Sequence, residues 1–181
     1  MEENVRRRKA VPSALRVSRA AAALTLGRCD EAESQAWAIL KTDPSNIGAM
    51  EVLARALWRQ AKLEELLTVL DRLSAANPGE PGYAALRGSA LQSLGRYGEA
   101  ARAFERGSQI PTARRALDEL QKWQEDLIRD LHASDPVFRV HFARSPGQAC
   151  SARGLYLAPR IYEPAIPGFE PPRPQLYSRP S

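Results

Sequence analysis

The sequence predicts an all-α protein, built as a solenoid of antiparallel helix hairpins. Three observations indicate this fold class: a 34-residue repeat, apolar residues three and four positions apart, and a shift of proline toward the end of the chain. The pair Asn77-Pro78 repeats Asp43-Pro44 at that interval. Nine of the 14 prolines follow Asp135, so we expect a helical body before that residue and an extended segment after it.

Each of three windows in phase with this period predicts two helices. In the second window Leu53, Ala54 and Leu57 have the spacing of one helix face. Asp30 and Glu31 suit the start of a helix, where the helix dipole is positive. The expected helices span about 13–26 and 30–41 in window 13–46, 45–60 and 63–76 in window 47–80, and 81–94 and 97–109 in window 81–114.

A seventh helix is expected near 112–133. Leu117, Leu120, Trp123, Leu127 and Leu131 recur every three to four positions, and the opposite face is charged. A solenoid needs a terminal cap because its last repeat would otherwise expose an apolar side. We therefore divide the chain into a basic N-terminal segment (1–12), a helical body with its capping helix (13–133) and a Pro-rich tail (134–181).

The tail gives weaker signals. The alternation from Val137 to Phe142 is typical of a half-buried strand, and Leu155 to Leu157 could pair with it in a short hairpin. Beyond it, prolines with aromatic residues between them favour an extended conformation. Three interpretations stay open: a disordered tail, an extended arm docked on the body, or a ligand for an aromatic groove elsewhere.

The third window carries the fullest repeat pattern. Small residues allow two helices to cross closely, and a glycine after the first helix accepts a left-handed backbone. The pattern consists of Gly88, Leu91, Leu94, Gly95, Tyr97, Ala100 and Phe104. It resembles the tetratricopeptide repeat (TPR), and the resemblance covers about 13–46, 47–80 and 81–114.

The windows also depart from the TPR pattern. Window two has Ala61 where glycine is usual and Leu66 where alanine is usual. Window one places Cys29 and Ala36 at aromatic positions, and window three has Pro111 one position early. Three repeats in phase nevertheless favour the TPR interpretation.

The resemblance implies a binding groove lined by the first helix of each repeat. In the middle repeat Arg55, Trp58 and Arg59 form an aromatic surface between two guanidinium groups, and Trp and Arg are enriched in binding hot spots. The alternative for Trp58 is a core residue in a shifted register. The expected groove residues are Val17, Leu24, Glu51, Arg55, Trp58, Arg59, Ser89 and Gln92.

The residues at the groove positions argue against one function known in the TPR family. Chaperone-binding TPR proteins hold a C-terminal carboxylate with Lys and Asn, at positions that this sequence fills with other residues. They are Val17 and Ala21, Glu51 and Arg55, and Ala85 and Ser89.

Composition argues against several other functions. The net charge of +5 is spread along the chain, so nucleic-acid binding is not favoured, although contact through the arginines stays a minor alternative. Two cysteines, Cys29 and Cys150, fit a reducing compartment, and the apolar run from Ala20 to Leu26 is too short to cross a membrane. Only His132 and His141 could serve as a histidine base, and no metal or phosphate motif stands out.

The sequence thus predicts a cytoplasmic, non-enzymatic protein without a cofactor, acting as an adaptor or small chaperone. Its partner would be a protein or peptide segment held in the groove. The alternative is a structural subunit that uses the solenoid edge and the tail in a larger assembly. The oligomeric state is left open.

Overall fold

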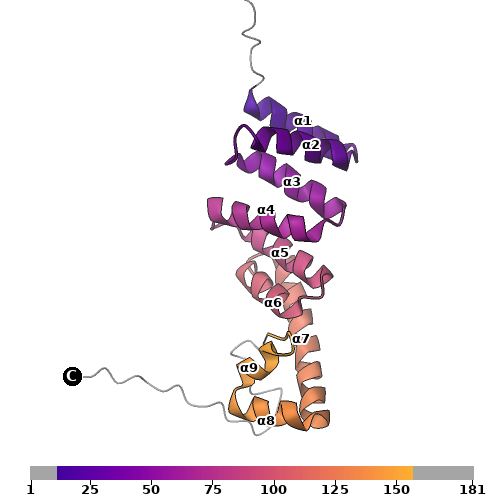
Figure 1. Cartoon of the computed structure of the whole chain (residues 1–181), viewed down its shortest axis with the longest axis vertical. Helices are drawn as coiled ribbons and strands as arrows, with labels where there is room; N and C mark the ends of the chain where they lie inside the picture. The colour runs from indigo at the N-terminus through magenta and orange to yellow at the C-terminus, as the bar shows by residue number, and fades with distance from the viewer. Residues whose placement is uncertain (1–11, 157–181) are drawn as a thin grey trace, which may run out of the picture.

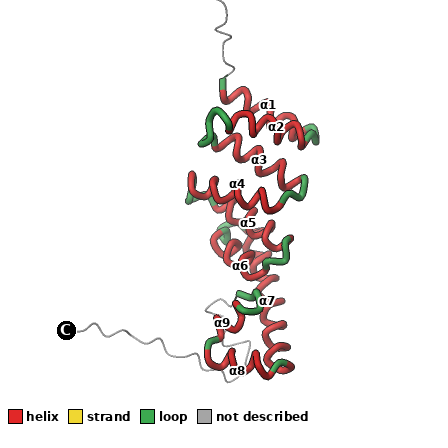
Figure 2. Tube along the Cα trace, in the orientation of Figure 1, coloured by secondary structure: helices red, strands yellow, loops and turns green. Residues whose placement is uncertain are grey.

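The computed structural model describes residues 12–156, and all regular secondary structure in this range is helical (Figure 2). Figure 1 shows a stack of helix hairpins along the long axis, with α7 continuing past α6 and carrying α8 and α9 at its side. The elements are α1 (Ser13–Thr25), α2 (Cys29–Leu40), α3 (Ile47–Arg59), α4 (Leu63–Ala76), α5 (Pro81–Ser93), α6 (Tyr97–Arg106), α7 (Pro111–Ser134), α8 (Pro136–Arg144) and α9 (Pro146–Ser151). The six predicted repeat helices and the predicted capping helix are confirmed.

A left-handed residue separates the two helices of every repeat. Gly27, Ala61 and Gly95 have φ angles of 77°, 55° and 73°, and they lie one repeat period apart. The chain reverses there because a left-handed residue ends the first helix and lets the second fold back on it. Ala61, the departure noted in the second repeat, adopts the same conformation despite its Cβ atom.

Small residues let the two helices of each hairpin cross closely. Ala20, Ala54 and Gly88, again one period apart, are all buried. A Cβ atom added to Gly88 would lie 2.5 Å from the ring of Phe104 in α6, which real contacts essentially never reach. The third hairpin therefore requires glycine at this position.

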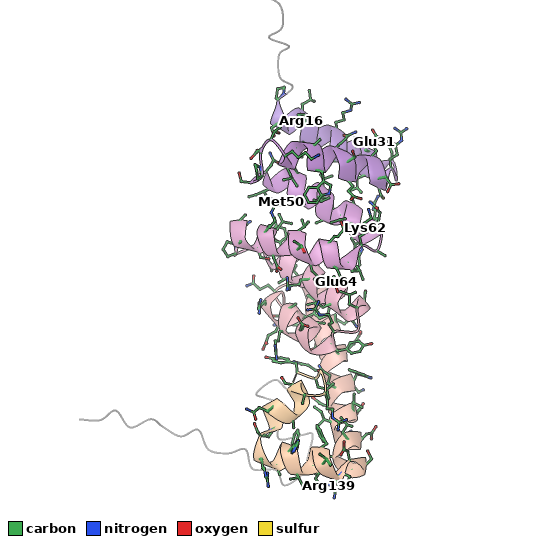
Figure 3. The ribbon with its side chains drawn as sticks, in the orientation of Figure 1. Arg16, Glu31, Met50, Lys62, Glu64 and Arg139 are labelled. Atoms are coloured by element: carbon green, nitrogen blue, oxygen red, sulfur yellow. The ribbon has the colours of Figure 1, made fainter. Side chains whose placement is uncertain are left out.

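The core of the stack is continuous from α1 to the first half of α7. Met50 is among its fully buried side chains and lies inside the stack, whereas Arg16 and Arg139 lie near the two ends of the described body (Figure 3). A second cluster gathers the remaining half of α7 with α8 and α9. Its buried members are Ile128, Phe138, Phe142, Ala149, Cys150 and Leu155.

The hairpin predicted at the start of the tail is wrong. Residues 137–142 lie in α8, where Phe138 and Phe142 are buried one turn apart and Val140, which the strand pattern would bury, is 50% exposed. Asp135 caps the helix by accepting hydrogen bonds from the backbone N–H groups of Val137 and Phe138 at 2.9 and 3.0 Å. Pro136 occupies the first turn, where a missing N–H costs nothing.

Leu155, assigned to the partner strand, is a buried residue after a turn, and Leu157 lies outside the described residues together with the Pro-rich part of the tail. The described body therefore continues past the predicted boundary at 133, because α8 and α9 bury an apolar face of α7. No helix within residues 12–156 is both long enough and apolar enough to cross a membrane.

The left-handed position provides a test of backbone strain. We expect Ala61→Gly to raise the free energy of unfolding and Gly95→Ala to lower it, each by about 1 kcal/mol, because only an L side chain is strained at positive φ. A Cβ atom at position 95 would meet nothing within 4 Å, so the change in stability of Gly95→Ala reports backbone strain and not a steric clash. Urea unfolding curves measure both changes. The same sign for both variants would contradict the assignment.

The α8 cap predicts a pH dependence. Backbone hydrogen bonds from Phe138 and Val137 and the neighbouring Arg153 lower the pKa of Asp135 below its ordinary value. A lowered pKa in the folded state means that the charged carboxylate stabilises the protein at neutral pH and that this contribution is lost as the pH falls below about 4. Asp135→Asn keeps a capping oxygen but no charge.

The stability difference between wild type and Asp135→Asn should therefore shrink from pH 7 to pH 3, as measured by urea midpoints at both pH values. A difference that stays constant would show that the charge of Asp135 makes no contribution.

Candidate functional site

The first helices of the three hairpins are α1, α3 and α5, and we call their shared surface the first-helix face. α1 packs directly on α3, whereas α3 and α5 approach each other much less. Two glycines one period apart mark the difference. A Cβ atom at Gly48 would lie 3.2 Å from Val17 of α1, but one at Gly82 would approach only Glu80, its own neighbour. The first-helix face is thus closed between α1 and α3 and open between α3 and α5.

A pocket of about 250 Å³ occupies the opening between α3 and α5. Its polar lining comes from Glu51 and Arg55 of α3 and from Glu80 and Tyr83 at the start of α5. Leu70 and Leu73 of α4 lie behind, and both are almost fully buried. The complete lining is Glu51, Ala54, Arg55, Leu70, Leu73, Glu80, Gly82, Tyr83 and Leu86.

The Tyr83 hydroxyl bridges the two helices by donating a hydrogen bond to Glu51 Oε1 at 2.8 Å. Burial, followed by this hydrogen bond, raises the pKa of Tyr83 to about 12. The hydroxyl therefore stays protonated at physiological pH and continues to donate to Glu51. This bond holds the Glu51 side chain at the edge of the pocket and leaves its second oxygen able to accept a further bond.

Arg55 supplies the free cation of the site. Its side chain is exposed beside the pocket, and within residues 12–156 it has neither a hydrogen bond nor an ion pair. An arginine in this state can donate two parallel hydrogen bonds to a carboxylate. The pocket therefore combines an apolar interior with one available guanidinium group at its edge.

The other two predicted groove residues of α3 differ in whether they are available to a ligand. Trp58 is 38% exposed, one turn beyond Arg55, so its ring is at the surface and not in the core. Arg59 is engaged within the protein, because its guanidinium donates a 2.5 Å hydrogen bond to the Leu24 carbonyl at the end of α1. Its positive charge there suits the negative end of the α1 dipole.

The residues predicted in α1 and α5 do not join the pocket. Val17 packs against Gly48, and the Leu24 side chain is buried, so both hold α1 on α3. Ser89 donates to the Ala85 carbonyl within its own helix, and Gln92 is exposed further along α5. Of the eight predicted residues, only Glu51 and Arg55 line the pocket.

Tyr83 and Glu80 are pocket residues that the sequence pattern did not select. Tyr83 lies one position after Gly82, outside the set of positions that the TPR resemblance assigns to ligands. A signal was present in the residues Pro81-Gly82-Tyr83, since an aromatic residue beside a glycine in a first helical turn has room to reach a neighbouring helix.

A thiol and an imidazole, two side chains capable of chemistry, lie in and beside the second core cluster. Burial raises the pKa of the Cys150 thiol to about 11, which keeps it protonated at neutral pH. His132 is half-buried and meets the Phe142 ring edge-on, with 6.1 Å between the ring centroids. Within the described residues no three His, Cys, Asp or Glu side chains are placed to hold a metal ion.

Solved structures share this architecture. The first TPR of Spaghetti (RPAP3), bound to the HSP90 peptide SRMEEVD, is 21% identical with a TM-score of 0.56, over 61% of this chain and 90% of that chain. A thermophilic TPR protein of Thermus thermophilus is 24% identical with a TM-score of 0.51, over 74% of this chain and 80% of that one. The chain therefore has the TPR fold predicted from its repeats.

An enzyme is also among the similar structures. A Thermobaculum terrenum O-GlcNAc transferase mutant is 22% identical with a TM-score of 0.50, and the match covers 68% of this chain but only 23% of the transferase chain. No protein-family model and no curated protein matches the sequence.

The bond between Tyr83 and Glu51 predicts a late tyrosine titration. We expect one of the five tyrosines to ionise near pH 12 by phenolate absorbance, and Glu51→Gln to move this step toward 10, leaving the effect of burial. Because the folded pKa is raised, the contribution of Tyr83 to stability is complete below pH 10 and is lost as the pH rises through 12.

Tyr83→Phe is the control, since it should remove the late step altogether. Titration of every tyrosine together near pH 10 would show that the hydrogen bond does not form in solution.

Proposed function

We propose that this protein is a non-enzymatic interaction module, an adaptor or small chaperone, that holds an extended segment of another protein on its first-helix face. The observation that carries this proposal is the α3–α5 pocket, where an apolar interior meets the guanidinium group of Arg55, which has no ion-pair partner among residues 12–156. Trp58, one turn further along α3, extends the contact surface with an exposed aromatic ring.

The size of the pocket favours one side chain over a whole small molecule. At about 250 Å³ it falls below the volume of roughly 300 to 1,000 Å³ that encloses a drug-sized ligand. The best-fitting ligand places an apolar side chain in the pocket and an Asp or Glu beside it, in reach of Arg55. Glu51 and Glu80 also line the pocket, and their negative charges disfavour a second acidic group beside them.

The RPAP3 structure supports a peptide ligand of this kind. Its bound peptide, SRMEEVD, combines apolar and acidic residues. The present chain lacks the Lys and Asn clamp described above, so we propose that it recognises acidic side chains within a segment and not a chain terminus.

A second candidate function is that of a structural subunit in a larger assembly. Leu15 and Leu26 of the first hairpin are 60% and 68% exposed at the end of the stack, where a neighbouring subunit could cover them. The tail that this alternative also uses lies mostly outside the described residues. The cytoplasmic location inferred from cysteine usage belongs to the proposal as well.

A random peptide library selected on the full chain tests the proposed ligand. The enriched peptides should share an apolar residue next to Asp or Glu. For the best peptide, Arg55→Glu should weaken binding about tenfold by calorimetry, because a favourable charge pair becomes repulsive. Gly82→Leu should also weaken it by filling the pocket, where a Cβ atom meets only the flexible Glu80 side chain.

Arg106→Glu is the control of matched charge change, since Arg106 is exposed on α6 and does not line the pocket, and it should leave affinity unchanged. Selected peptides that bind Arg55→Glu and Gly82→Leu as tightly as the wild type would contradict the proposed site. A chain that forms defined oligomers by light scattering, and loses them on Leu26→Glu, would favour the structural-subunit alternative.

A further inference from the structure

An exposed aromatic pair lies on a different surface, where α6 meets α7. Tyr97 begins α6, and its ring centroid lies 4.8 Å from that of Trp123 in α7, with the ring planes 57° apart. The two residues are 37% and 44% exposed. The other ring pairs of the described chain, His132–Phe142 and Phe138–Phe142, are built on buried phenylalanines.

This pair presents what an extended proline-rich segment needs. Two tilted rings offer apolar faces against which proline rings can pack. A polyproline II segment makes no internal hydrogen bonds, so its carbonyl groups need outside donors. The Tyr97 hydroxyl and the Trp123 indole N–H form no hydrogen bond within residues 12–156, and both can donate.

The last described residues lie beside the same pair. The Gly98 N–H donates to the Gly154 carbonyl at 3.0 Å, and the Tyr156 N–H donates to Gln124 Oε1 at 2.7 Å. Gly98 follows Tyr97 and Gln124 follows Trp123, so each of these two hydrogen bonds is made by a residue next to a member of the aromatic pair. Gln124 is 1% exposed, and within the described residues its Nε2 group has no acceptor. Residues 154–156 are thereby fixed between α6 and α7.

The chain continues from this point for 25 residues, seven of them proline. The densest part lies between Pro164 and Pro174, with Pro167, Pro171 and Pro172 inside it. Seven residues lie between Tyr156 and Pro164, and the eight steps from one to the other span up to about 26 Å when extended, so the proline-rich segment can reach the surface around the pair. A tether this short also gives an effective concentration of the order of millimolar.

We propose that the proline-rich segment 164–174 of this chain docks on the Tyr97–Trp123 pair. The site is separate from the α3–α5 pocket and does not depend on the function proposed for it. Docking would cover the exposed aromatic pair and hold this segment against α6 and α7, so the pair is an internal docking site and not a free surface for a partner.

Limited chymotrypsin digestion of the full chain tests this proposal. The Phe169–Glu170 bond lies inside the docking segment and the Tyr177–Ser178 bond lies beyond it, so the two bonds serve as probe and reference in one molecule. Trp123→Ala should speed cleavage after Phe169 about tenfold and leave cleavage after Tyr177 unchanged, because cleavage follows the open population. Trp37→Ala, at a tryptophan 37% exposed on α2, is the matched control and should change neither.

The Trp123 indole N–H gives a second readout that does not involve a change in the body. In heteronuclear spectra, replacing Pro171, Pro172 and Pro174 by glycine should shift the Trp123 indole signal and leave those of Trp37 and Trp58 in place. Equal cleavage after Phe169 in wild type and Trp123→Ala, or an unmoved Trp123 signal, overturns the proposal. Protection that grows with protein concentration overturns it too, because the docked segment then belongs to a second copy.

Discussion

In each of the three repeat hairpins, the two helices cross closely at a small residue. Ala20, Ala54 and Gly88 repeat at one position, and the Phe104 ring against Gly88 leaves no space for even a methyl group. Such close approach buries apolar faces with little side-chain volume, so short helices gain enough contact to be stable. The left-handed residues at 27, 61 and 95 allow this crossing by reversing the chain within a few residues.

Stacking the hairpins then decides where the surface is closed and where it is open. Gly48 lets α1 and α3 approach each other, and Val17, Leu24 and Arg59 serve that contact. Among the described residues, a Cβ atom at the equivalent Gly82 would touch no neighbouring helix, so α3 and α5 leave room for a pocket with a hydrogen bond from Tyr83 to Glu51 across it. A glycine at the same repeat position therefore allows close packing between α1 and α3 but lines a pocket between α3 and α5. Its effect depends on the distance to the neighbouring first helix.

Helices α7, α8 and α9 do not pack as a further repeat. α7 is longer than a repeat helix, and its two halves belong to two separate clusters of buried side chains. Its first half caps the solenoid, as a terminal repeat requires. Its second half would expose Ile128 if α8 and α9 did not fold back over it. The prolines that open α8 and α9 mark helix starts, so proline content alone does not identify an extended tail.

Periodicity along the chain was sufficient to predict the repeat, the helix order, the capping helix and the presence of Arg55 and Trp58 on the surface of α3. These features depend on residues such as Gly95 and Gly88, whose roles are local and recur every 34 positions. The packing of the hairpins determined which first helices touch, and thereby that Glu51, Arg55 and Tyr83 meet while Val17 and Leu24 are used in packing. Packing also selected a helix for residues 137–142. The pattern of apolar residues there fits a strand or a helix, and the Asp135 cap and burial against α7 favour the helix. Local patterns specify elements, but a site between elements depends on distances between helices that no single repeat encodes.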